Sequence, residues 1–471
     1  MRILLARPFV DSTVGVSPPF ALMSLSASLK QHGIAVEILD HCQERGAMLP
    51  FNMRNPVTAR FIAQVRERRA DLVGMTLFSR ELRDIATLAA LVKEQLPGIQ
   101  LVLGGPHPTA MPRETLLHIP ACDFVVRGEG EEVLRELVRA LARASPLAHV
   151  AGLTFRDAAG GLAATPDAPL LADLDALPFP DRAEVLQHYR DRTYSSFVYG
   201  SPSDLLMTSR GCPYRCRFCF KVCGRYRGRS PQRVLEEIDW VMENIRPASI
   251  QLMDDSFTIQ RERAHAILDG LVARRHRVKL KVRSRVDAVD EPLLAKMKRA
   301  GVDTVVYGFE SGSNAMLQAF DKRTTVEQNV RACHLTRRAG LHCLGDMILF
   351  YPGETPATLA ATERFVREAK PTAVKFYVLT PLPQTRVYED AKAAGTLVGD
   401  WDGSEQTPWV RLPEFADLET MQAIAKRMYL RTLLQPFRAA GILAAYGGAM
   451  LRRPRLAAGL VLANLRKRMK Y

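Results

Sequence analysis

Residues 209–219 read SRGCPYRCRFC and place Cys212, Cys216 and Cys219 in a C-x3-C-x2-C spacing. This segment follows a short apolar run, Leu205–Thr208, which predicts a β-strand. Three thiolates on one loop can hold three irons of a cubane iron–sulfur cluster, whereas four cysteines are the usual ligand set. The spacing therefore predicts a cluster with one iron left open to a substrate or cofactor.

Two other interpretations of these cysteines stay open. A zinc site normally has four ligands, and Cys223 could supply the fourth thiol. Incidental cysteines are the other alternative, although chance would rarely give this spacing directly after a strand. The remaining cysteines are scattered along the chain, so a disulfide framework is not indicated.

Short apolar runs alternate with helical patterns across residues 201–420. The expected strands are Leu205–Thr208, Ile250–Met253, Leu280–Arg283, Thr304–Gly308, Leu344–Phe350 and Ala373–Leu379. The expected helices are Pro231–Asn244, Arg261–Arg274, Glu291–Ala300, Val326–Ala339 and Pro356–Ala369. Six strands joined by helices predict a partial (β/α)6 barrel with its active site at the carboxyl ends of the strands.

A second α/β pattern occupies residues 1–150. Its expected strands are Ile3–Ala6, Val36–Leu39, Leu72–Leu77, Leu101–Leu103 and Phe124–Val126, which predict a flavodoxin-like, doubly wound parallel sheet. Such sheets bind ligands at the carboxyl ends of their strands, where this sequence has Thr76, Gly104 and Gly105. Tight turns alone would also explain these glycines. Residues 151–200, with several prolines, are expected to form a connector.

Charge is concentrated in a basic tail, residues 421–471. The chain of 471 residues has a net charge of +15, but this tail holds eleven Lys or Arg and no Asp or Glu. The rest of the chain carries only +4, so a basic nucleic-acid-binding core is not implied. Apolar helical segments flanked by cations fit an anionic membrane surface, and a final cap on the barrel is the alternative. No run reaches the roughly 18 apolar residues of a spanning helix.

The cysteine segment resembles the signature of radical S-adenosylmethionine (SAM) enzymes. Similar segments of the family's cobalamin-dependent class occur at residues 228–231, 253–257, 307–312, 351–355 and 380–385, although Gln384 replaces the usual glycine. Residues 104–109 and 126–131 are similar to the amino-terminal cobalamin (B12)-binding domain of that class. The resemblance covers about residues 1 to 400.

The resemblance implies a [4Fe–4S] cluster on Cys212, Cys216 and Cys219, with SAM on the open iron. The residues implied to contact SAM are Phe218, Asp254, Arg285, Glu310, Ser311 and Gly353. The alternatives are a surface carboxylate for Glu310 and a structural ion pair for Arg285.

The cobalamin-binding residues implied by the resemblance lie in the first unit. They are Thr76, Gly104, Gly105, His107, Gly128 and Glu129. The pattern Asp-x-His-x-x-Gly, which supplies a histidine to cobalt in some methyltransferases, does not occur. The resemblance therefore implies cobalamin without a histidine ligand to cobalt.

The cofactors implied, a [4Fe–4S] cluster, SAM and cobalamin, indicate radical chemistry. An electron from the cluster would cleave SAM, the 5′-deoxyadenosyl radical would remove hydrogen from an unactivated carbon, and methylcobalamin would supply a methyl group. Oxidative cyclisation or rearrangement within the same class is the first alternative, and a sensor without turnover is the second.

The expected partners are a small-molecule or lipid substrate and an electron donor such as flavodoxin or ferredoxin. No nucleic acid is expected. The expected location is the cytoplasm, with peripheral membrane contact through the basic tail.

Overall fold

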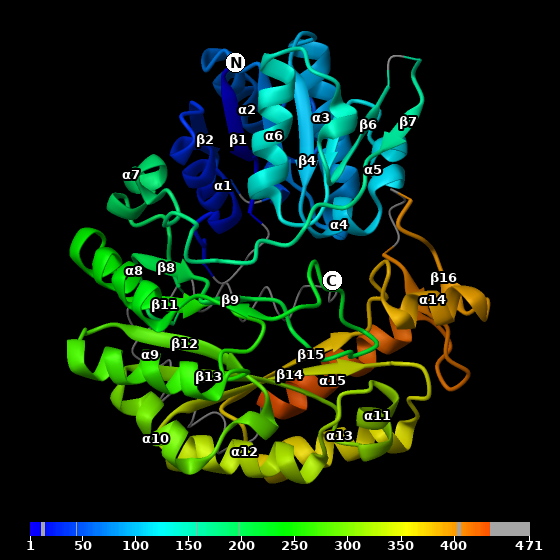
Figure 1. Cartoon of the computed structure of the whole chain (residues 1–471). Helices are drawn as coiled ribbons and strands as arrows, with labels where there is room; N and C mark the ends of the chain where they lie inside the picture. Colours follow the sequence, from blue (N-terminus) through cyan, green and yellow to red (C-terminus); the bar gives the residue numbers. More distant parts are fainter. Residues whose placement is uncertain (11–14, 44, 158, 197, 403–406, 434–471) are drawn as a thin grey trace. The chain divides into compact units, whose positions relative to one another are not determined.

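The computed structural model describes residues 1–10, 15–43, 45–157, 159–196, 198–402 and 407–433 (Figure 1). The chain divides into two α/β units. The first is built mainly on Met1–Thr193, and the second mainly on Tyr194–Phe220 and Gly224–Gly399.

The first unit contains a sheet with the strand order β2-β1-β3-β4-β5-β6-β7. The strands are β1 Ile3–Arg7, β2 Val36–Asp40, β3 Leu72–Thr76, β4 Gln100–Gly104, β5 Phe124–Val126, β6 Leu153–Arg156 and β7 Leu162–Ala164. Strands β1 to β5 are parallel, in the order of a flavodoxin-like sheet, which confirms the predicted fold class.

Helices connect these strands because each carries one apolar face. They are α1 Phe20–Gln31, α2 Pro56–Glu67, α3 Leu82–Gln95, α4 Pro106–Ala110, α5 Pro112–His118, α6 Gly130–Ala142 and α7 Leu186–Arg190. In α6, Val133, Leu137 and Val138 are buried at helical spacing. Helix α2 begins where the Asn55 side chain accepts a hydrogen bond from the Val57 amide.

The sheet extends into the predicted connector. Strands β6 and β7 pair antiparallel and add two strands beyond β5, so part of residues 151–200 belongs to the first sheet. These strands have four and three residues and no helix between them. They therefore lack the alternation of strands and helices that identified the others.

The second unit contains the parallel sheet of the partial barrel, in the order β15-β14-β13-β12-β11-β8. Its strands are β8 Ser203–Leu206, β11 Ser249–Leu252, β12 Lys279–Ser284, β13 Val302–Glu310, β14 His342–Leu349 and β15 Ala373–Val378. Each overlaps one of the six predicted strands, although β8 shares only Leu205 and Leu206 with the predicted Leu205–Thr208. Two small antiparallel pairs join β9 Ser209–Arg210 to β10 Arg227–Gly228 and β16 Leu397–Val398 to β17 Trp409–Val410.

Most helices of this unit lie along the outer side of the barrel sheet, whereas α14 lies beside β16 (Figure 1). They are α8 Pro231–Asn244, α9 Arg261–Arg274, α10 Glu291–Arg299, α11 Asn314–Ala319, α12 Val326–Arg338, α13 Pro356–Ala369, α14 Arg386–Ala393 and α15 Leu418–Leu433. Proline lies in the first turn of α8, α10 and α13, where the missing N–H costs no helical hydrogen bond. One apolar cluster unites sheet and helices, with Leu280 and Val282 of β12 fully buried in it.

Within the described ranges, no helix has the length and apolar character needed to cross a membrane. Helix α15 includes the start of the predicted tail, residues 421–433. Residues 434–471 lie outside the described part of the chain, so the predicted membrane-binding tail stays a prediction from the sequence.

Candidate functional site

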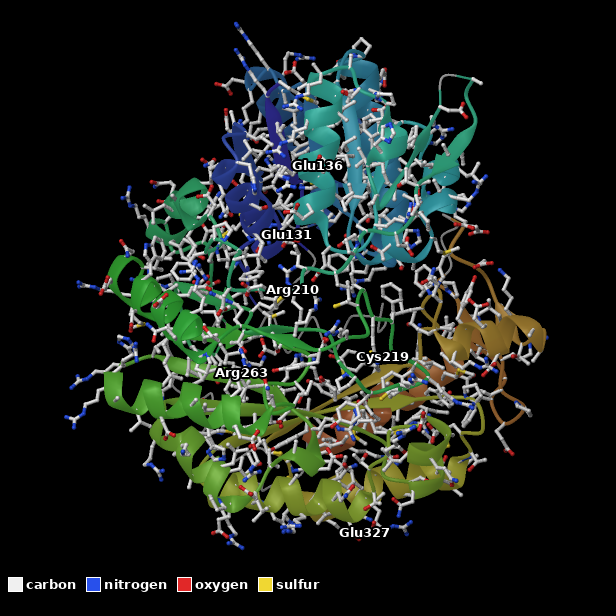
Figure 2. All side chains as sticks on the ribbon, viewed as in Figure 1. Glu131, Glu136, Arg210, Cys219, Arg263 and Glu327 are labelled. Atoms are coloured by element: carbon white, nitrogen blue, oxygen red, sulfur yellow. The ribbon has the colours of Figure 1, made fainter. Side chains whose placement is uncertain are left out.

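The three clustered cysteines lie on one loop, the cysteine loop, which connects β9 and β10. Cys212 and Cys216 are partly buried, and Cys219 is exposed on the loop that follows Arg210 (Figure 2). None of the chain's cysteines, all of which lie in the described part, forms a disulfide. Three thiol donors are therefore presented from a single short segment.

Asp254 holds the start of the cysteine loop. One carboxylate oxygen accepts hydrogen bonds from the backbone N–H groups of Thr208 (2.6 Å) and Ser209 (3.1 Å), and the other accepts from the Thr208 hydroxyl. Burial raises the pKa of Asp254, and the hydrogen bonds from Thr208 oppose that shift. Asp254 is only 1% exposed, so the geometry favours a loop-positioning role over the contact with SAM that the resemblance implied.

Arg263 of α9 joins both ends of the cysteine loop. Its Nε donates to the carbonyl of Arg229 at 2.6 Å, and its Nη2 donates to the carbonyl of Thr208. Arg229 in turn pairs with buried Glu237 of α8. The loop therefore begins and ends on charged groups anchored in two barrel helices.

Glu310 and Lys322 form a buried ion pair at the carboxyl end of β13. The Lys322 Nζ lies 2.8 Å from the Glu310 Oε1, and the two residues are 9% and 6% exposed. Glu310 adopts φ of +62°, a left-handed conformation that costs free energy for a residue with a side chain. Gly308 faces this pair, since a Cβ there would lie 2.2 Å from Glu310 Oε1. Glu310 is therefore no surface carboxylate.

Arg285 connects the end of β12 to the cysteine loop. Its guanidinium carbon lies 3.7 Å from the ring centroid of Tyr214, which lies between Cys212 and Cys216. The same guanidinium binds the Asp287 carboxylate at 2.9 and 2.8 Å and donates to the Lys322 carbonyl at 3.0 Å. Arg285 thus forms an ion pair, as the alternative interpretation expected, and its guanidinium also stacks on Tyr214 of the cysteine loop.

The electrostatic surroundings of Cys216 come from these same groups. Burial raises the pKa of the Cys216 thiol, while Lys322 and Arg285 act in the opposite direction. Burial disfavours the charge on Lys322, but Glu310 and Cys216 raise its pKa above the ordinary value. The charges of Lys322 and Arg285 therefore favour the thiolate form of Cys216, which a cluster ligand needs.

Aromatic contacts dock the middle of the cysteine loop. Phe218 packs edge-on against Phe320, with ring centroids 5.5 Å apart, and Phe320 packs against Tyr351 at 4.6 Å. The Arg217 amide donates to the carbonyl of Phe320 at 3.0 Å. Phe218 is thereby fixed beside the cysteines, and its contact with SAM stays a prediction.

The last two residues predicted to contact SAM lie at neighbouring strand ends. The hydroxyl of Ser311 lies 3.3 Å from that of Thr362 and accepts from the Ser313 amide. Gly353 has φ of +90° and open space where a Cβ would be, in the turn between β14 and α13. Ser311 is thus held by the protein itself, whereas Gly353 leaves room beside the backbone.

In the first unit, Thr76, Gly104 and Gly105 meet at the carboxyl ends of β3 and β4. The Leu77 amide donates to the carbonyl of Gly104 at 2.9 Å, joining the two strand ends. Gly105 has φ of +106°, and a Cβ there would lie 2.9 Å from Thr76 and 3.2 Å from the Leu77 carbonyl oxygen. Only glycine permits this close approach of backbones.

His107 lies one turn beyond this edge and is fully buried. Its Nδ1 lies 3.0 Å from the Ser79 hydroxyl, whereas its Nε2 has no hydrogen-bond partner among the described residues. Burial lowers the pKa of His107 to about 4, with a further contribution from His118, so the ring is neutral near pH 7. An unpartnered buried nitrogen is costly unless a ligand or water satisfies it.

Gly128 and Glu129 follow β5 at the same edge of the sheet. The Gly128 amide donates to the Thr109 hydroxyl at 3.0 Å, and Glu129 accepts from the Leu171 amide at 2.9 Å. Glu129 therefore ties the following segment to the sheet.

Several residues of the site were not identified from the sequence. Lys322, Arg263 and Ser79 lie between motifs, and nothing local distinguishes them from surface residues. Lys281 and Arg283 could have been noticed in the sequence. Parallel barrel strands that are covered on both faces are usually continuously apolar, so two charged residues within a predicted strand are unusual.

Comparisons with known proteins agree with this arrangement. Residues 6–138 match the B12 binding domain family, and residues 206–366 match the radical SAM superfamily. The chain is 30% identical over 449 residues to an uncharacterized methyltransferase, PH0819, of Pyrococcus horikoshii, covering 93% of each chain.

An anaerobic magnesium-protoporphyrin IX monomethyl ester cyclase of Rubrivivax gelatinosus is 30% identical over 341 residues, covering 69% of this chain and 60% of that enzyme. Among solved structures, the radical SAM methyltransferase TsrM from Kitasatospora setae, with cobalamin and a [4Fe-4S] cluster bound, has a TM-score of 0.72 at 20% identity. That similarity covers 93% of this chain and 89% of TsrM.

Proposed function

Because the chain belongs to the cobalamin-dependent radical SAM enzymes, we propose that it transfers a methyl group to an unactivated carbon of its substrate. The single observation that carries the proposal is the pairing of the two sites in one chain. One site presents three thiols beside a buried lysine, and the other presents a neutral histidine beside a glycine edge.

The residues of the second unit fit a [4Fe–4S] cluster. Cys212, Cys216 and Cys219 would hold it, since three thiolates leave one iron for SAM. When bound, the cluster supplies the electron that cleaves SAM. Lys322 and Arg285 would favour the thiolate form of Cys216 by their charge, and Asp254 and Arg263 would keep the loop in place.

The residues of the first unit fit cobalamin. Gly104 leaves room at its strand end, where a Cβ would lie 3.8 Å from the Val126 carbonyl oxygen, and the buried His107 Nε2 needs a partner that a polar group of the cofactor would provide. When bound, cobalamin supplies the methyl group. Thr76 and Gly128 would line the same edge, and His107 would act through a hydrogen bond.

The products test this proposal. Methyl transfer consumes SAM in two ways: cleavage gives methionine and 5′-deoxyadenosine, and remethylation of cobalamin gives S-adenosylhomocysteine. Reduced, anaerobically reconstituted protein with substrate should therefore form 5′-deoxyadenosine and S-adenosylhomocysteine in about equal amounts. Cys212→Ala should form neither, and a variant that retained a full cluster and cleaved SAM would contradict the assignment.

Cyclisation is the second candidate, supported by the similarity to the protoporphyrin ester cyclase. It needs no methyl group, so 5′-deoxyadenosine without S-adenosylhomocysteine would favour it.

The electron donor and membrane contact remain proposals from the sequence. A small iron–sulfur or flavin protein would deliver the electron, and the basic residues 421–471 would hold the enzyme at an anionic surface. Co-sedimentation of the full chain with anionic and neutral vesicles, compared with a chain ending at Leu418, tests the second point. Equal pelleting of both chains would contradict membrane contact.

A further inference from the structure

Three cations lie on the inner face of the barrel sheet, the face turned away from the outer helices. In β12, Leu280 and Val282 are buried in the core cluster shared with the helices. Because side chains alternate along a strand, Lys281 and Arg283 point to the inner face. The same alternation in β15 buries Val374 and Phe376 and leaves Lys375 exposed on the inner face.

Strand register brings one carboxylate to the same face. Asp346 of β14 pairs directly with Lys375 of β15 and with Gly308 of β13. The side chains of Glu310 and Lys322 cover Gly308 on the inner side of the sheet. Asp346 therefore adds one carboxylate to the face that carries Lys281, Arg283 and Lys375.

In the described part of the chain, these four charged groups lack a direct partner. None of the four side chains makes a hydrogen bond or ion pair with another described residue, whereas Lys322 and Glu310 above them are paired. Burial, together with the charges of Lys375 and Arg283, lowers the pKa of Lys281 to about 8, and Asp346 opposes this shift. Lys281 pairs with Thr304, whereas Lys375 lies in register with Asp346 and Gly308, so Lys281 and Lys375 are separated both across the strands and along them.

Barrel interiors are normally filled by bulky apolar side chains. Lys281 is the partly buried member of the three, whereas Arg283 and Lys375 are exposed, and a partly buried cation without a partner is unfavourable unless a ligand supplies the opposite charge. We propose that Lys281, Arg283 and Lys375 bind an anionic group of the substrate, a phosphate or carboxylate, on the inner face of the barrel. This inference rests on the proposed function and adds the chemical class of the substrate.

The carboxylate of SAM is a different ligand. Arg285 and Cys216 lie at the carboxyl ends of the strands, and Lys281 precedes Arg285 by four residues, roughly 13 Å along a strand. Lys375, in register with Asp346 and Gly308, lies near the level of Arg285, whereas an anion held mainly at Lys281 and Arg283 lies deeper in the barrel. A substrate anchored there would extend its carbon skeleton towards the cysteine loop.

The test measures anion binding to the anaerobic holoenzyme. Inorganic phosphate and, separately, acetate are titrated at constant ionic strength, with sodium chloride as the reference, and the thermal-unfolding midpoint gives the apparent affinity. Phosphate protection stronger than acetate protection would indicate a phosphorylated substrate, and the reverse a carboxylate. The absence of protection by both anions would overturn the proposal.

Variants locate the binding. Lys281→Met with Lys375→Met should weaken anion binding at least about tenfold, since charge-assisted hydrogen bonds are lost. Arg299→Met, which removes an exposed cation from outer helix α10, is the matched control and should leave it unchanged. Asp346→Asn should tighten anion binding several-fold, a gain that misfolding does not produce.

Equal affinity in all variants would overturn the proposal. SAM binding, followed by the change in the cluster spectrum, is measured in parallel. Parallel loss of SAM and anion binding would assign the cations to SAM instead. An enzyme that bound phosphate at these cations but formed no S-adenosylhomocysteine would contradict methyl transfer and leave the anion site standing.

Discussion

The Lys322 Nζ lies 2.8 Å from the Glu310 Oε1, and both side chains are buried beside Cys216. Lys322 is twelve residues from Glu310 and follows α11, so the pair joins the end of β13 to the segment after that short helix. The same lysine favours the thiolate form of Cys216, which links barrel stability to the cluster.

Breaking this pair should destabilise the barrel strongly. Lys322→Met leaves the Glu310 carboxylate buried without a partner, which typically costs about 3–5 kcal/mol. Adding Glu310→Gln should recover much of the loss, because the unpaired charge disappears. Urea unfolding of Lys322→Met, of Glu310→Gln and of the double variant measures these changes in the free energy of unfolding. Additive losses in the double variant would show that the two residues act independently.

Removal of the Asp254 carboxylate should release the cysteine loop. Asp254→Ala leaves two buried backbone N–H groups unsatisfied, at about 1–3 kcal/mol each, whereas Asp254→Asn keeps one oxygen that can accept from both. Iron and sulfide content after reconstitution should therefore fall sharply in the alanine variant and modestly in the asparagine variant. Full cluster content in Asp254→Ala would refute the positioning role.

Replacement of His107 should weaken cobalamin binding selectively. His107→Phe keeps a buried ring but removes the Nε2 group that lacks a protein partner. Loss of one hydrogen bond to the cofactor should reduce affinity about tenfold, as measured by the absorbance of retained cobalamin. Exposed His149→Gln is the control, and iron content should stay unchanged in both variants. Normal cobalamin retention in His107→Phe would remove this residue from the site.

Glu354 should make stability fall as pH rises. Burial raises the pKa of its carboxyl to about 7 in the folded protein, so the folded chain keeps a proton that the unfolded chain loses above about pH 4.5. Between about pH 4.5 and 7 this group therefore removes up to about 1.4 kcal/mol of stability per pH unit, and its full cost is reached above pH 7.

Glu354→Gln should abolish that slope and stabilise the protein at pH 8. Glutamine can still accept from the Phe350 amide, and its N–H can donate to Thr358, whose hydroxyl also lies 3.0 Å from the Thr355 carbonyl. Urea unfolding across this pH range compares the two proteins. Parallel pH profiles would assign the dependence to other groups.

Much of the fold could be predicted from the sequence because its signals are local. The spacing of Cys212, Cys216 and Cys219 and the alternation of apolar runs with helices depend on neighbours in the chain. Strands β6 and β7 were missed because short antiparallel strands are specified by their pairing partners. Parallel strand ends converge at one edge of a sheet, which is why Thr76, Gly104 and Gly105 could be grouped in advance.

The sequence by itself determined the two α/β patterns, the spacing of the three cysteines and the family resemblance. Only the tertiary structure decided that Asp254 and Arg263 hold the cysteine loop, that Lys322 pairs with Glu310, and that unpaired cations gather on the inner barrel face. The physical reason is distance along the chain. Burial, charge pairing and hydrogen-bond satisfaction depend on residues brought together from separate strands and helices, and no local pattern records those encounters.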